Sequence, residues 1–129
     1  MFCLDTNIVI DFLNGNKSVI EKVYIKKKEN KIFITFISLC ELYKGIYLSN
    51  KSDIELKILD EFLNSIELVE MNKQSCDLFG KDFSILRKKG KMVPEADLMI
   101  ASIVKTNNLI LITMDKKHFN NLGIKVEVW

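Results

Sequence analysis

Apolar residues follow two spacings along the chain, and the two spacings alternate. Short apolar runs, which are typical of strands, occupy residues 2–4, 31–35, 66–71, 109–113 and 125–129. Stretches with apolar residues every three or four positions, which predict helices, occupy residues 6–15, 18–30, 38–48, 53–64, 73–89, 94–104 and a short segment near 116–120. Alternating strands and helices predict an α/β fold in which helices cover both faces of a parallel sheet.

The ends of these segments carry recognisable start and stop residues. Thr6 or Asn7 is expected to cap the first helix, and Gly15 to end it. Gly90 breaks the long helical stretch before it, and Pro94 opens the next helix at a position that Pro tolerates.

Two acidic residues stand directly after predicted strands. Asp5 follows the first strand, and Asp115 comes two residues after the run "LILIT". Ligand sites in parallel α/β sheets lie beyond the carboxyl ends of the strands. If the two strands are neighbours, both carboxylates face the same crevice.

Two further acids lie in helices with apolar neighbours. Asp97 falls in the first turn of a largely apolar helix, and Glu41 lies within "SLCELYKG", one turn before Gly45. Taken alone, Asp97 could be a helix N-terminal charge, and Glu41 could be a solvated helix residue. Gly45 is costly inside a helix, which is tolerable if something must approach the helix closely.

Together, the four acids predict a metal site. Carboxylates crowded in one place repel each other unless a cation is present. Oxygen ligands without His or Cys favour Mg²⁺ or Mn²⁺, and such a site suits hydrolysis of a phosphodiester. His118 is the only His, and we expect a surface position or a local hydrogen bond for it rather than a role as general base.

Size and composition fit one domain that spans residues 1–129. Hydrophobic residues make up 48% of the 129 residues, which is enough for a core, and no apolar run is long enough to span a membrane. The first residues do not resemble a signal peptide, so we expect a cytoplasmic protein. Cys3, Cys40 and Cys76 are expected to be buried thiols in a reducing compartment.

The net charge of +2 is uninformative, but the basic residues cluster. The only Arg is part of the run "RKKGK", which supplies candidate RNA-backbone contacts at Arg87, Lys88, Lys89 and Lys91. These residues come just before Pro94 and Asp97, so we expect their loop to reach the mouth of the acidic site. The alternative is that these residues form a solvated helix face.

The strings that contain the four acids resemble those of the PIN-domain ribonucleases. "LDTNIVIDFL", "ISLCELYKG", "VPEADLMIAS" and "LILITMDKKHF" occur in that order. The resemblance covers almost the whole chain and is greatest to the VapC-type toxins of toxin–antitoxin pairs.

This resemblance implies a three-layer fold with a five-stranded parallel sheet in the order 3-2-1-4-5. It also implies an endoribonuclease that depends on Mg²⁺ or Mn²⁺, with a VapB-like antitoxin as partner and a homodimer as the usual assembly. The catalytic acids of the family are matched by Asp5, Glu41, Asp97 and Asp115. Of these, Asp5 and Asp97 match metal ligands. Asn7 and Thr113 match residues that position these groups.

Two other classes of function stay open. A phosphoacceptor domain also gathers acids at the carboxyl edge of a parallel sheet, but it would need an Asp at the end of the third strand, where this chain has "IELVEM" followed by Asn72. A non-catalytic RNA- or protein-binding module could use the same fold. Phosphate transfer to Asp from a small donor would test the first class, and metal-dependent cleavage of RNA would separate the enzyme from the second.

Overall fold

A computed structural model describes all residues from Met1 to Trp129. The elements in chain order are β1 (Phe2–Leu4), α1 (Thr6–Leu13), α2 (Lys17–Glu29), β2 (Ile32–Thr35), α3 (Phe36–Tyr47), α4 (Ser52–Leu63), β3 (Glu67–Val69), α5 (Lys73–Lys89), α6 (Glu95–Thr106), β4 (Ile110–Thr113), α7 (Lys116–Phe119) and β5 (Lys125–Val128). Each predicted strand and helix is present, with ends that differ by a few residues.

The strands form one parallel sheet in the order β3-β2-β1-β4-β5, as the resemblance implied. In the centre of the sheet, Cys3 of β1 pairs with Phe33 on one side and with Leu111 on the other. Because β1 and β4 are neighbours, the residues that follow them emerge side by side at the carboxyl edge.

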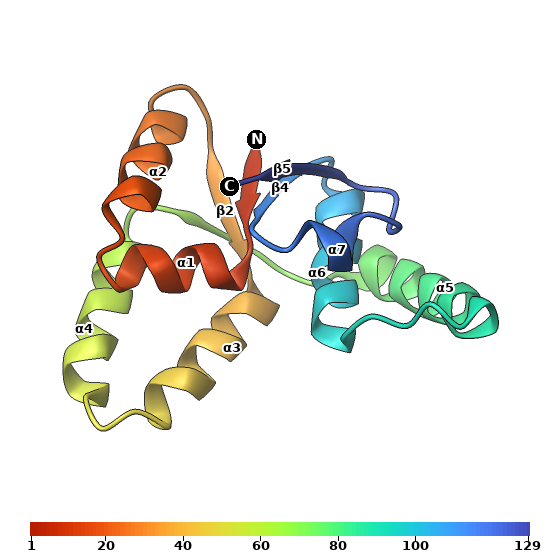
Figure 1. Cartoon of the computed structure of the whole chain (residues 1–129), viewed down its shortest axis with the longest axis horizontal. Coiled ribbons are helices and arrows are strands. Elements are labelled where there is room, and N and C mark those ends of the chain that lie inside the picture. Colours follow the sequence, from red (N-terminus) through yellow and green to blue (C-terminus); the bar gives the residue numbers. More distant parts are fainter.

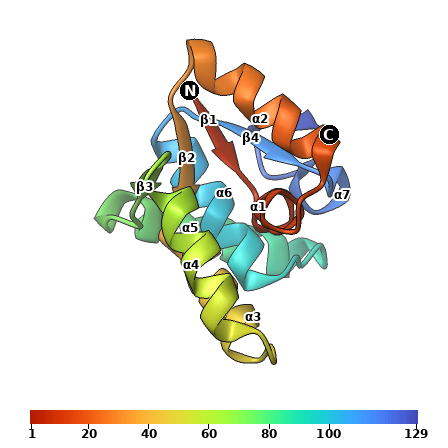
Figure 2. The ribbon, with the colours of Figure 1, turned by 90° about the vertical axis from the view of Figure 1, so that its left-hand side faces the viewer.

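Two hydrophobic cores lie on the two faces of the sheet. One contains the inward residues of α1, α2, α3 and α4, and the other those of α5, α6 and α7. Side chains alternate between the faces along each central strand, so that Cys3 and Leu111 belong to one core while Leu4 and Ile112 belong to the other. The result is a three-layer arrangement, with α1–α4 on one side and α5–α7 on the other (Figures 1 and 2).

Helix α6 accounts for much of the second core. Six of its residues are buried, from Leu98 to Val104, as its apolar sequence predicted. None of the helices combines the length and the apolar character needed to cross a bilayer.

Two expectations about individual residues are wrong. The first helix is capped by Asp5 rather than by Thr6 or Asn7, because the helix begins directly after the strand while Asp5 still has extended backbone angles. Cys40 and Cys76 are exposed rather than buried, because they lie on the outward faces of α3 and α5. Only Cys3 is buried, and burial raises the pKa of its thiol to about 12.

Candidate active site

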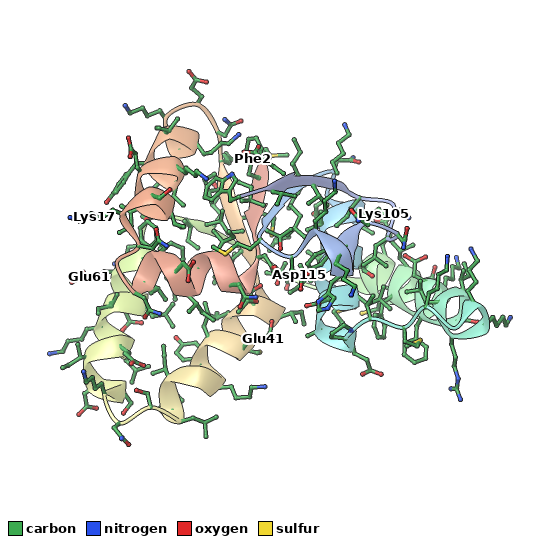
Figure 3. The ribbon with its side chains drawn as sticks, viewed as in Figure 1. Phe2, Lys17, Glu41, Glu61, Lys105 and Asp115 are labelled. Carbon is green, nitrogen blue, oxygen red and sulfur yellow. The ribbon has the colours of Figure 1, made fainter.

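A cavity of about 360 Å³ lies at the carboxyl edge of the sheet, and α1, α3, α6 and α7 contribute to its walls. Four carboxylates line it, from Asp5, Glu41, Asp97 and Asp115. They come from four separate segments, namely the β1–α1 junction, α3, the first turn of α6 and the β4–α7 loop. Figure 3 shows Glu41 and Asp115 near the start of α1, on the side where β1 and β4 end. The fold therefore brings together the four acids that the sequence singled out.

Asp5 is the most deeply placed acid. Its side chain is held through both oxygens: Oδ1 accepts a hydrogen bond from the backbone N–H of Thr6 at 2.8 Å, and Oδ2 accepts one from the Thr113 hydroxyl at 2.6 Å. Thr113 is fully buried and accepts a hydrogen bond from the backbone N–H of Asp115 at 2.9 Å. Thr113 thus joins the residues that follow the two central strands, and it contacts Asp5 directly.

Glu41 is connected to the same network through Thr6. The Thr6 hydroxyl donates a hydrogen bond to Glu41 Oε1 at 2.8 Å. Because Thr6 also donates its N–H to Asp5, it holds two acids from distant parts of the sequence. The other carboxylate oxygen of Glu41 makes no hydrogen bond within the protein and remains available to water or to a ligand.

His118 lies between the remaining two acids. Its Nδ1 is 2.8 Å from Asp97 Oδ2 and 2.9 Å from Asp115 Oδ2. The expectation of a local hydrogen bond for His118 is confirmed, but its partners are two of the four acids of the cavity. Sequence patterns gave no signal for this contact, because it depends on how the short helix α7 is placed against the start of α6.

Burial and the charges of neighbouring acids raise the pKa of Asp5 and of Asp97. Burial is the largest cause of the raised pKa of Asp5, the hydrogen bonds from Thr113 and Thr6 oppose it, and the charges of Glu41 and Asp115 add to it. Burial, followed by the charge of Asp5, likewise raises the pKa of Asp97, and His118 partly offsets the rise. The hydrogen bonds to Asp5 and Asp97 therefore compensate only part of the cost of placing negative charge in the cavity.

The donor set fits a hard divalent cation. All four acids offer oxygen atoms, which Mg²⁺ and Mn²⁺ prefer. No three His, Cys, Asp or Glu side chains converge as ligands of a single ion in the present side-chain arrangement. The acids are instead hydrogen-bonded to Thr6, Thr113 and His118. The residue types and their crowding therefore support a metal site, although the side chains are not arranged as a coordination sphere.

The other candidate residues are divided between this cavity and a remote surface. Asn7 is exposed on the cavity wall. Arg87, Lys88, Lys89 and Lys91 are exposed but do not line the cavity. They lie at the end of α5 and in the following turn, at the edge of the molecule furthest from α3 and α4 (Figure 1). Of the loop that follows them, Pro94 reaches the cavity.

Lys44 is a cavity residue that sequence reasoning missed. It is exposed, lines the wall beside Glu41 and forms no ion pair with any of the four acids. Its position three residues after Glu41, on the same helix face, was the signal that could have revealed it.

The chain is similar in sequence and in fold to known proteins. The PIN domain family model matches residues 2–125. The ribonuclease VapC2 of Rickettsia felis is 30% identical, and the match covers 100% of this chain and 98% of that protein. The tRNA(fMet)-specific endonuclease VapC of Shigella flexneri is 27% identical, with 99% of this chain and 97% of that protein covered. The crystal structure of VapBC2 from Rickettsia felis bound to promoter DNA superimposes with a TM-score of 0.93 at 29% identity, covering 99% of this chain and 98% of that chain.

The raised pKa of Asp97 has a consequence for stability. Below the unfolded pKa, which lies near 3.8, the carboxyl is protonated in both states. Between this pH and the higher folded pKa, the unfolded chain ionises while the folded protein stays protonated. The free energy of unfolding of the wild type therefore falls as the pH rises through this range. In metal-free buffer we therefore expect Asp97→Asn to gain stability relative to the wild type as the pH rises from the unfolded pKa, near 3.8, to the raised folded pKa of Asp97. Urea unfolding at a series of pH values measures this difference.

Glu127 provides a control of the opposite sign. Burial tends to raise its pKa, but the hydrogen bonds from Lys26 and Trp129 outweigh burial and lower it. Its stabilising effect is present above about pH 4.5 and is lost as the pH falls through its lowered pKa, so Glu127→Gln should lose stability relative to the wild type as the pH rises. If the stability difference between Asp97→Asn and the wild type does not change as the pH rises above 3.8, our account of the crowded cavity is contradicted.

Proposed function

The chain belongs to the PIN domain family and to its VapC-type branch, and from that membership we propose that it is a metal-dependent endoribonuclease that acts as the toxin of a toxin–antitoxin pair. The observation that carries the proposal is the convergence of Asp5, Glu41, Asp97 and Asp115 on one cavity. The relatives add support, since the Rickettsia felis protein is named a ribonuclease and the Shigella flexneri protein is named a tRNA(fMet)-specific endonuclease.

In this proposal Asp5 and Asp97 hold Mg²⁺ or Mn²⁺. When bound, such an ion lowers the pKa of water and stabilises negative charge on a phosphate. Thr113 keeps Asp5 oriented through the 2.6 Å hydrogen bond. The free oxygen of Glu41 accepts a hydrogen bond from the attacking water, while Thr6 holds the other oxygen in place. Asp115 adds a fourth carboxylate to the lining of the cavity.

We expect the purified protein to cleave RNA in the presence of Mg²⁺ or Mn²⁺ and to stop when EDTA is added. The Asp97→Asn variant should keep its fold, because any loss of the helix-dipole interaction, about 1 kcal/mol at most, is opposed by relief of the repulsion between carboxylates. Its cleavage rate should fall by more than the roughly 10–100-fold that loss of an outer-shell partner costs. Gel assays with initiator tRNA and with a single-stranded RNA measure the rates, and circular dichroism checks the fold.

Asp11→Asn on α1 is the matched control, because Asp11 carries the same group but does not line the cavity. It should cleave at nearly the wild-type rate. Cleavage that survives exhaustive chelation would disprove the metal mechanism. RNA binding without cleavage under all metal conditions would instead favour a non-catalytic module on the same fold.

We further propose that Arg87, Lys88, Lys89 and Lys91 contact the RNA backbone away from the cleaved bond. Replacing all four with Ala should weaken RNA binding and lower the dependence of log affinity on log salt by about 0.7 for each phosphate that is no longer neutralised. Fluorescence anisotropy at several salt concentrations in EDTA measures both quantities. The matched control replaces Lys17, Lys22, Lys27 and Lys28 of α2, which changes the net charge equally. If the two variants lose the same affinity, the cluster has only a general electrostatic effect.

The antitoxin is proposed to bind an apolar groove that adjoins the acidic cavity. This groove, of about 260 Å³, lies between α1, α3 and α4 and shares Ile10, Glu41 and Gly45 with the cavity. A Cβ placed on Gly45 would meet no atom within 4 Å, so the helix presents bare backbone to the groove. A segment with apolar side chains could enter the groove and obstruct the acids. The similarity to the VapBC2 complex of Rickettsia felis supports an antitoxin as the partner that binds there. A homodimer of this chain remains a prediction.

Two isoleucines of α4 give a matched test of the groove. Ile58 lines it, whereas Ile54 is more exposed, at 62%, and does not. We expect Ile58→Glu to weaken binding of the cognate VapB-like antitoxin by more than about tenfold, because a charge would enter an apolar contact. Ile54→Glu should have little effect. Calorimetry measures both, and equal losses would place the antitoxin elsewhere.

A further inference from the structure

His118 engages Asp97 and Asp115 in different ways. It binds both oxygens of Asp115, since its backbone N–H is 3.3 Å from Oδ1 and its Nδ1 is 2.9 Å from Oδ2. It binds only one oxygen of Asp97, because Nδ1 lies 2.8 Å from Oδ2 and the other oxygen makes no hydrogen bond within the protein. One oxygen of Asp97 therefore has no hydrogen-bond partner in the protein, whereas each oxygen of Asp115 has a partner in His118.

The position of the imidazole is fixed from both sides. The next residue, Phe119, is 1% exposed and anchors α7 in the second core. On the other side, Asp97 precedes Leu98, which is fully buried in the same core. Nδ1 is thus held at the junction of two anchored helices, and the Asp97 carboxylate cannot rotate freely without breaking its hydrogen bond to the imidazole.

From this asymmetry we infer that His118 is a positioning residue for the metal site. It holds Oδ2 of Asp97 and leaves the other oxygen free, so that this oxygen would be available to bind the cation, and it holds Asp115 through both of its oxygens. Carboxylates that bind metals are commonly held by such outer hydrogen bonds, and loss of one typically costs 10–100-fold in metal affinity. This inference rests on the proposed function, because it concerns the same cation.

The choice of substitution makes the inference testable. The amide nitrogen of Asn can take the place of Nδ1, whereas the amide of Gln reaches further and corresponds to Nε2. We expect His118→Ala and His118→Gln to weaken Mn²⁺ binding by about 10–100-fold and His118→Asn to stay within about threefold of the wild type. Titration calorimetry on the chelator-treated protein measures the affinity without any RNA or cleavage.

Lys117→Ala is the control, because Lys117 is exposed in the same turn and does not line the cavity. It should bind Mn²⁺ as the wild type does. If His118→Ala does not fold, the comparison of Asn with Gln still decides, since both are polar side chains of similar size. Unchanged affinity in folded His118→Ala or His118→Gln would overturn the inference, and so would tighter binding, which would mean that the imidazole competes with the ion.

The failure of this inference can be told apart from the failure of the proposed function. If the wild type binds Mn²⁺ and all His118 variants bind equally well, only the role of His118 is wrong. If the wild type binds neither Mn²⁺ nor Mg²⁺, the metal mechanism itself fails and the inference falls with it.

Discussion

Repulsion between four carboxylates in one cavity is the constraint around which this fold is arranged. The acids are separated by hydrogen-bond donors, so that no acid depends on another for a partner. Following the hydrogen bonds through the side chains and the backbone N–H groups gives one continuous path, namely Asp97, His118, Asp115, Thr113, Asp5, Thr6 and Glu41. Each donor offsets part of the cost of burying a charge, and the raised pKa values of Asp5 and Asp97 show that the offset is incomplete.

The parallel sheet makes this arrangement possible at low cost. β1 and β4 lie side by side and end at the same edge, so Asp5 and the Thr113–Asp115 segment meet without any long loop. The helices on the two faces then bring one acid each, with Glu41 on α3 and Asp97 on α6. Because buried cores cover both faces of the sheet, charged side chains can gather at its carboxyl edge without disturbing the packing.

The sequence predicted the elements, the strand order and the meeting of the four acids, because these follow from apolar spacing, the family resemblance and the rule for the carboxyl edge. Apart from Thr113, to which the resemblance gave a positioning role, it did not predict the partners of the acids. The Thr6–Glu41 and His118–Asp97 contacts join residues whose separation depends on helix packing rather than on any local pattern. The remote position of the basic cluster was missed for a similar reason. The 17 residues of α5 carry that cluster away from the sheet. The direction in which this helix points depends on its packing and cannot be inferred from the order of residues in the sequence.

Asp5 has two duties, since the same carboxylate caps α1 and lines the acidic cavity. These two roles limit which substitutions position 5 can accept in evolution. A lineage that no longer needed the cavity would still need the start of the helix, and Asn or Ser satisfies a helix start about as well as Asp does. Ala would lose both duties at once. A descendant that has lost its activity should therefore carry a small polar residue at position 5, and such a replacement would record the loss of the chemistry while the helix remained.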